Sequence, residues 1–357
     1  MLFELSERQN LTPHDNTQPR YRVRLRSDHA LDYEVGDWVS VVGENPPQLV
    51  ERVLQALACK GDERIHLRRQ GEQPLAQALT QHIELTQLDP AILNRLVRQY
   101  GYQNWSDRAQ MLAYAQGKDV LDLLHAFPAL AELGASFIDL LSPLAPRYYS
   151  IASAPQHSPN SIDLIFKHIQ FERADRWHQG VVSTWLSTQP IGARIEADLK
   201  ANLQFKPPHQ TTTPMIMLAA GTGIAPFIGF MQHRLAHSAH QNWLLFGETH
   251  AASHFLCQAQ LSAWQQQGAL KLSTAFSRDQ ADKIYIQDRL WHARDTFIDW
   301  WQQGAQVYVC GNKIGMGLAV EATIKRIWQQ AFNWDDDTLN QAWLSAKQQG
   351  RLQFDLY

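Results

Sequence analysis

Hydrophobic and polar positions alternate strictly in residues 20–27, RYRVRLRS. Tyr21, Val23 and Leu25 point to one side and four arginines point to the other, which is typical of a half-buried strand with a basic outer face. A second apolar stretch, residues 33–42, predicts another strand, which the chain enters through a turn at Gly36 and Asp37. The first part of the chain is therefore expected to be β-structure.

From residue 47 to about residue 144 the period becomes helical. Apolar residues recur at steps of three and four in residues 49–57, and the stretches LDPAILNRLVRQY and DVLDLLHAF are further helical patterns. Strand patterns return with PRYYSIAS and SIDLIFKHI, residues 146–153 and 161–169. We therefore expect a helical segment between two β-rich parts.

After residue 207 strand and helix patterns alternate to the last residue. The segments NWLLFGET, GALKLSTAFS and AQVYVCGN each predict a short buried strand that ends at Gly, Ser or Asn. This alternation predicts a parallel sheet with right-handed crossovers. Ligands of such sheets bind beyond the carboxyl ends of the strands.

The apolar run in residues 214–234, PMIMLAAGTGIAPFIGFMQHR, has more than one interpretation. It approaches about 17 residues, the lower limit for crossing a membrane. Its composition instead favours a buried strand, a turn at Gly221 and Gly223, and a helix with Pro226 in its first turn. Such a turn brings backbone N–H groups and the positive end of a helix dipole to one point, as pyrophosphate binding requires. A glycine-rich turn that holds no ligand is the remaining alternative.

The bulk composition narrows the classes of function. A length of 357 residues suits two or three domains, and a net charge of −3 gives no sign of nucleic-acid binding. The first ten residues, MLFELSERQN, lack the basic and apolar pattern of a secretory signal. Cys59, Cys257 and Cys310 are too few and too scattered for a disulfide framework or a thiolate metal site. We expect a cytoplasmic protein with no metal site.

Residues 147–155, RYYSIASAP, combine three groups that suit a flat, phosphorylated cofactor. Arg147 can hold a pyrophosphate, Tyr149 can stack on a ring, and Ser150 can hydrogen-bond to a ring nitrogen. An ordinary strand explains the same letters equally well, so this segment alone decides nothing.

Residues 277–287, SRDQADKIYIQ, are more discriminating. Lys283, Tyr285 and Gln287 lie two apart, so a strand would present them on one face, and Ser277 with Arg278 would close the site from the loop before. Two cations, a hydroxyl and an aromatic ring suit an adenosine that carries a 2′-phosphate, which favours NADP(H) over NAD(H). The alternative is a solvated basic loop.

Six motifs, in this order, resemble the FAD- and NADP-binding module of the ferredoxin-NADP reductase superfamily, in its diflavin reductase branch: RYYS, GVVSTWL, GTGIAPF, SRDQADKIYIQ, YVCG and GRLQFDLY. Within that branch the sequence is most similar to the sulfite reductase NADPH flavoprotein (alpha) group, and next to the NADPH-cytochrome reductases. The resemblance covers nearly the whole chain and includes no part of the branch's flavodoxin-like FMN domain.

The resemblance implies a β plus α/β fold. We expect an antiparallel β-barrel FAD domain from residues 1–46 and 145–208, a helical connecting insert over residues 47–144, and a parallel-sheet α/β NADP(H)-binding domain over residues 209–357. Ala219, Ala220 and Asn312 depart from the glycine, proline and aspartate that are usual at these positions.

The resemblance also implies the site residues. The catalytic set is Ser150, Cys310, Asp355 and Tyr357, and the terminal tyrosine would leave the flavin face before nicotinamide stacks there. The cofactor-binding set is Arg147, Tyr149, Ser150, Gly180, Val181, Val182 and Ser183 for FAD; Gly221, Thr222 and Gly223 for the NADPH pyrophosphate and ribose; Ser277, Arg278, Lys283, Tyr285 and Gln287 for the 2′-phosphate end; and Tyr357.

The function implied is an NADPH-dependent flavoprotein oxidoreductase that passes electrons from NADPH through FAD to an acceptor. The acceptor would be an FMN-bearing flavodoxin-like protein or domain, or a sulfite-reductase-type haemoprotein. A free-standing ferredoxin or flavodoxin reductase is the alternative among enzymes, and a docking subunit without turnover is the alternative of another class. The four arginines of residues 20–26 are a candidate docking surface for an acidic partner, with a solvated strand as the competing explanation.

Overall fold

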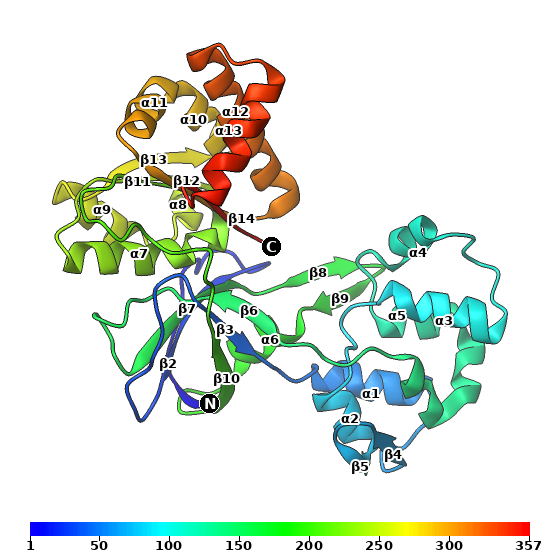
Figure 1. Ribbon diagram of the computed structural model, residues 1–357. Coiled ribbons are helices and arrows are strands. Elements are labelled where there is room, and N and C mark those ends of the chain that lie inside the picture. Colours follow the sequence, from blue (N-terminus) through cyan, green and yellow to red (C-terminus); the bar gives the residue numbers. More distant parts are fainter. The chain divides into compact units, whose positions relative to one another are not determined.

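The computed structural model describes residues 1–357, which form two compact units. Unit 1 comprises Met1–Ser40, Tyr148–Lys167 and Pro190–Tyr357, and unit 2 comprises Val41–Arg147 and His168–Gln189. Their elements are labelled in Figure 1. None of the helices combines the length and apolar character that a membrane span requires.

Unit 1 contains an antiparallel sheet of six strands in the order β6-β3-β10-β1-β2-β7. An isolated bridge between Ile151 and Leu164 joins the segment after β6 to β7, so the sheet closes into a barrel. Val23 and Leu25 of β2 are fully buried inside it, as the alternating pattern predicts. The strands are β1 (Leu2–Asn10), β2 (Arg20–Arg26), β3 (Trp38–Val41), β6 (Arg147–Ser150), β7 (Ser161–Lys167) and β10 (Arg194–Lys200).

The remainder of unit 1 is a parallel sheet in the order β13-β12-β11-β14-β15. Successive residues of β11 face opposite layers: Met215 and Met217 pack on the side of α7 and α9, whereas Ile216 packs on the side of α10 to α13. Figure 1 shows these two helical layers. The strands are β11 (Met215–Ala220), β12 (Asn242–Glu248), β13 (Lys271–Phe276), β14 (Gln306–Gly311) and β15 (Leu352–Leu356).

The helices of this part are α7 (Ala225–Ala236), α8 (Ala251–His254), α9 (Gln258–Gln266), α10 (Ile286–His292), α11 (Arg294–Gln302), α12 (Leu318–Phe332) and α13 (Asp336–Gln348), with a 3₁₀ turn η2 (Gly221–Ile224) and a π turn η3 (Lys313–Gly317). Alternating strands and helices thus build the parallel sheet that the sequence predicts.

Unit 2 is mainly helical, and its helices enclose one apolar core. Asp89 and Asp119 begin α3 and α5 by accepting hydrogen bonds from backbone N–H groups of the first helical turn. The helices are α1 (Pro47–Ala56), α2 (Leu75–Gln81), α3 (Pro90–Tyr100), α4 (Arg108–Ala115), α5 (Val120–Ala126), η1 (Pro128–Leu140, 3₁₀) and α6 (Val181–Thr188).

Two hairpins in unit 2 have no counterpart in the expected pattern. They are β4 (Arg64–Leu67) with β5 (Gly71–Pro74), and β8 (Gln170–Arg173) with β9 (Arg176–Gln179). The second one turns through Ala174 and Asp175, both of which have positive φ, although neither is a glycine. This turn therefore lacks the usual signal in the sequence.

Candidate functional site

The glycine turn after β11 has the predicted conformation. Gly221 has a φ of +56°, and a Cβ added to Gly223 would lie 2.2 Å from the carbonyl oxygen of Cys310. The turn therefore passes directly over β14, which only a residue without a side chain allows. The helix is entered through η2, whose N-cap residue Ala220 makes no side-chain capping bond, so no side chain occupies the first backbone N–H groups of the turn. At the start of α7 itself the Ala225 N–H donates to the Thr222 carbonyl and Pro226 has no N–H, so the groups that fit a pyrophosphate are those of the turn.

Ser150, Asp355 and Cys310 lie together in unit 1. The Ser150 Oγ donates to Asp355 Oδ2 at 2.9 Å, and Cys310 of β14 is the register partner of Asp355 in β15. The thiol is 1% exposed. Burial, together with the negative charge of Asp355, raises the pKa of Cys310 well above its ordinary value, so the thiol is protonated at neutral pH.

The last residue lies over the dinucleotide turn. The Tyr357 hydroxyl is 2.9 Å from Thr222 Oγ1, and its backbone N–H donates to the Gly311 carbonyl at 3.2 Å. The residue is nevertheless 63% exposed. A single side-chain hydrogen bond holds the ring, so displacing the ring breaks little.

The expected 2′-phosphate residues are placed differently from the prediction. Ser277 and Arg278 follow β13, and their backbone N–H groups donate to the carbonyls of Glu248 and Thr249. The expectation that Lys283, Tyr285 and Gln287 share a strand face is wrong, since residues 277–285 are turn and loop.

The cause is a helix start that the alternating pattern conceals. Gln287 is the second residue of α10, and the Tyr285 N–H donates to Asp288 Oδ2 at 2.8 Å, which fixes the first turn. Tyr285 and Lys283 precede that turn and are exposed. Both side chains lie on the loop before α10, where they remain available to a ligand.

The residues of the RYYS motif point in different directions. Tyr149 lies against Phe166, with 5.8 Å between ring centroids, while Ser150 faces Asp355. In unit 2, Arg147 donates to Glu84 Oε2 at 2.7 Å and to the Ala145 carbonyl at 3.0 Å. Glu84 therefore already engages the guanidinium that was expected to bind pyrophosphate.

Helix α6 of unit 2 begins at the GVVSTWL motif. Gly180 is its N-cap residue, and no side chain caps this end. Ser183 Oγ accepts the Ile169 N–H at 3.1 Å and donates to the Gly180 carbonyl at 3.3 Å. The backbone N–H groups of Val181 and Val182, rather than the Ser183 hydroxyl, are therefore the donors that this helix end presents to an anion.

The basic stripe of β2 is largely neutralised. Arg20 is 8% exposed and pairs with Asp15 and Glu248, and Arg22 and Arg24 both bind the buried carboxylate of Asp163. Arg26, at the end of the strand, pairs with Glu4. Because each arginine has an acidic partner, the hypothesis of an open basic docking surface here loses its support.

Two residues of this region were missed by sequence reasoning. The Trp38 indole Nε1 donates to Asp355 Oδ2 at 3.2 Å, and Glu248 Oε1 accepts from Arg20 at 3.0 Å at the carboxyl end of β12. The position of Glu248 at the end of a predicted strand was a usable signal. No motif or periodic pattern in the sequence links Trp38 with Asp355, because the two residues are 317 positions apart.

One cluster in unit 2 has the composition of a metal site. Ligand atoms of Asp119, Asp122 and His178 lie within 4.8 Å of one another. The Arg176 guanidinium contacts all three at 2.6 to 2.8 Å. A guanidinium thus supplies the positive charge that a metal ion would bring.

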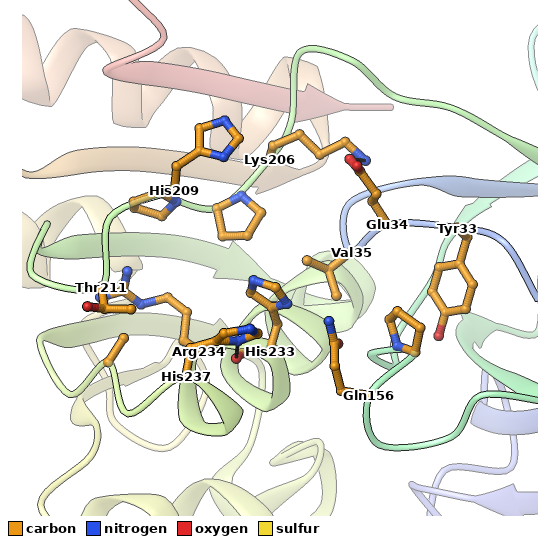
Figure 2. A pocket seen from close by; sticks show the side chains of 14 residues that line it. Tyr33, Glu34, Val35, Gln156, Lys206, His209, Thr211, His233, Arg234 and His237 are labelled. Atoms are coloured by element: carbon orange, nitrogen blue, oxygen red, sulfur yellow. Dashed lines mark hydrogen bonds and ion pairs between the residues drawn. The ribbon is translucent and has the colours of Figure 1, made fainter.

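A separate cavity of about 310 Å³ lies in unit 1. Figure 2 shows His209, His233 and His237 around it. Lys206 at its edge pairs with Asp37 and Glu34, and Arg234 binds Asn242 and two backbone carbonyls. None of the predicted cofactor residues lines this cavity.

Comparison with known families identifies two domains. The FAD binding domain matches residues 89–185, and the oxidoreductase NAD-binding domain matches residues 217–321, which include the glycine turn, Cys310 and Ser277. The chain carries both domains. With the antiparallel and parallel sheets, these matches confirm the expected fold class and the expected oxidoreductase domains for FAD and a cofactor of the NAD(P) type.

The flavoprotein is similar over most of its length to curated sulfite reductase [NADPH] flavoprotein alpha-components. That of Bacillus subtilis is 31% identical over 99% of this chain and 60% of its own length, and that of Mannheimia succiniciproducens is 35% identical over 84% and 51%. A Yersinia pestis protein of the same name is 32% identical over 99% and 59%. The chain thus spans about half to three-fifths of these relatives.

Proposed function

We propose that this flavoprotein oxidises NADPH at a bound FAD and passes the electrons to an FMN-bearing flavodoxin-like partner or a sulfite-reductase-type haemoprotein. The observation that carries the proposal is the convergence of Ser150, Asp355 and Cys310 beside a turn that Tyr357 covers. No strong nucleophile is needed, because the cofactors supply the redox chemistry.

The binding of NADPH is assigned to three parts of unit 1. The backbone N–H groups of the η2 turn, with Gly221 and Gly223, hold the pyrophosphate. Arg278 and Lys283 supply the positive charge for the 2′-phosphate, and this preference agrees with the NADPH in the relatives' names. Tyr357 gives way when the nicotinamide ring enters, after its bond to Thr222 is released.

Groups for FAD are assigned in each unit by itself: Tyr149 and Ser150 in unit 1, and Arg147 and the N–H groups at the start of α6 in unit 2. FAD held by these groups would supply the redox chemistry, namely acceptance of hydride from NADPH and release of single electrons. Buried, protonated Cys310 and hydrogen-bonded Asp355 exclude water and fix the polarity around the site of transfer. The domain boundaries at residues 46, 144 and 208 remain part of this proposal.

The partner is proposed from the relatives. Their names identify a flavoprotein component of sulfite reductase, which supports a haemoprotein as the final acceptor. We assign the helical core of unit 2 to the insert that, by the resemblance, the diflavin branch uses to position an FMN domain. The compartment proposed is the cytoplasm, in keeping with three cysteines that form no disulfide.

The proposal is tested by supplying acceptors one at a time to the FAD-loaded protein with NADPH under anaerobic conditions. We expect rapid reduction of a purified flavodoxin and slow reduction of the haemoprotein unless flavodoxin is present. Fast reduction of ferredoxin or flavodoxin, with no effect on any haemoprotein, would favour the free-standing reductase. Binding of the partner without any NADPH oxidation would favour the docking subunit.

A further inference from the structure

Two neutral donors meet on one carboxylate oxygen in unit 1. Ser150 Oγ donates to Asp355 Oδ2 at 2.9 Å, and Trp38 Nε1 donates to the same oxygen at 3.2 Å. The motifs that identify Ser150 and Asp355 assign no role to Trp38. The indole is nevertheless as directly bonded to Asp355 as the serine is.

The backbone that carries Trp38 is fixed on both sides. Asp37, the preceding residue, accepts hydrogen bonds from Lys206 Nζ at 2.7 Å and from the Asn202 N–H at 2.8 Å, and its carbonyl accepts the Ile151 N–H at 3.0 Å. Trp38 itself begins β3 of the barrel. The indole N–H is therefore presented by a rigid element, as a positioning group requires.

The Trp38 ring is also held at its side. It meets Tyr148 edge-on, with 6.2 Å between ring centroids and an angle of 74°. An edge-on aromatic pair limits rotation of the indole. The direction of the N–H bond is thus set before any ligand binds.

The charge of Asp355 depends on these donors. Burial raises the pKa of Asp355, while the bonds from Trp38 and Ser150 lower it. The titratable groups that interact with its charge are the Cys310 thiol on β14 and the Tyr357 hydroxyl at the chain end, and neither carries positive charge. The two neutral donors are therefore what stabilises the ionised carboxylate.

We propose that Trp38 is a positioning residue that keeps the Asp355 carboxylate ionised and in one orientation beside Ser150 and Cys310. This inference rests on the proposed function, since a fixed negative charge there stabilises the positive charge that develops on nicotinamide as it gives up hydride. Trp38 acts through Asp355 and needs no contact with the reacting atoms.

The test replaces Trp38 by phenylalanine, which keeps a ring and removes the N–H. In carboxyl-¹³C NMR titrations of the oxidised, FAD-loaded protein, we expect the pKa of Asp355 to be higher in W38F than in the wild type. In rapid-mixing experiments with NADPH, hydride transfer at pH 7 should slow by about tenfold, and its pH profile should shift upward.

Two controls separate positioning from loss of structure. In W243F a buried indole loses the 3.0 Å hydrogen bond from Trp243 Nε1 to Ser273 Oγ, which is similar in length to the bond that W38F removes. The Trp243 bond joins β12 and β13, whereas Asp355 lies in β15. That variant should be less stable but keep the wild-type pH profile. In a D355N background, W38F should cause little further loss of rate, because the group it acts on has gone.

An unchanged Asp355 pKa in W38F, or an equal loss of rate with and without D355N, would overturn the proposal. Failure of the proposed function looks different: NADPH would not reduce the wild-type protein at all. The NMR titration still decides the role of Trp38 in that case, because a raised Asp355 pKa in W38F supports it and an unchanged one refutes it.

Discussion

Replacing Gly223 by alanine would bring a methyl group into steric clash with the backbone of β14. The added Cβ would lie 2.2 Å from the Cys310 carbonyl oxygen, 2.6 Å from its carbonyl carbon and 2.9 Å from the Gly311 Cα. These are main-chain atoms of a strand paired on both sides, with β11 and β15, so they cannot yield as a flexible side chain would. The turn itself must move.

Overpacking of this kind costs about 1–3 kcal/mol. Part of that cost falls on folding and part on nucleotide binding, since the displaced turn is the expected pyrophosphate site, and each 1.4 kcal/mol corresponds to about a tenfold change in affinity. We expect G223A to unfold at lower urea concentration and to bind NADP⁺ about tenfold more weakly by calorimetry, with FAD still bound.

Two glycines nearby serve as graded controls. At Gly315 an added Cβ would meet only Asn312 Oδ1 at 3.5 Å, an ordinary contact, so G315A should resemble the wild type. At Gly221 an added Cβ would meet only Glu248 Oε1 at 3.6 Å, an ordinary contact, but φ is +56°, so G221A should lose about 1 kcal/mol through backbone strain. If G223A and G315A have the same stability and the same NADP⁺ affinity, the close approach of this turn to β14 is refuted.

Other predictions follow from individual contacts. R176A leaves Asp119, whose side chain is 2% exposed, without its cation and should lower the free energy of unfolding by about 3–5 kcal/mol. R173A loses only an exposed bond to a carbonyl and should change the free energy of unfolding by less than about 0.5 kcal/mol. Equal effects of the two variants in urea titrations would contradict this. Because burial raises the pKa of Asp355, the wild type loses stability as the pH rises from the ordinary carboxyl range through that raised pKa. D355N should therefore be more stable than the wild type at pH 7, and the difference in stability should vanish in acid. A stability difference that does not depend on pH would be evidence against this. Removing the terminal ring in Y357A should tighten NADP⁺ binding, and Y357F, which keeps the ring and loses only the 2.9 Å bond to Thr222, should do so to a smaller degree; weaker binding in both would show that the ring assists the nucleotide.

The sequence predicts the parts of the site whose chemistry is local. Gly221, Gly223 and Pro226 specify a strand, turn and helix within twelve residues, and the structure has them as β11, η2 and α7. The same local logic misleads at residues 283–287, where alternation suggests a strand but Asp288, one residue further on, fixes a helix start. A capping residue here outweighs the hydrophobic period.

What the sequence does not reveal is contact between distant segments. Arg20 and Arg24 read as an exposed basic stripe because Glu248 and Asp163, which neutralise them, come from other strands. The bond from Trp38 to Asp355 is invisible for the same reason. Such partners are set by how the barrel and the parallel sheet of unit 1 pack, and no periodicity encodes them.

The central claim is that this chain takes electrons from NADPH onto FAD and recognises the 2′-phosphate. An anaerobic absorbance titration of the FAD-loaded protein with NADPH and, in parallel, NADH tests it directly. We expect NADPH to bleach the flavin band at far lower concentration than NADH, and R278A to narrow the difference between the two nucleotides. Equal bleaching by both nucleotides would contradict the phosphate site, and no bleaching by either, with FAD demonstrably bound, would contradict the reductase.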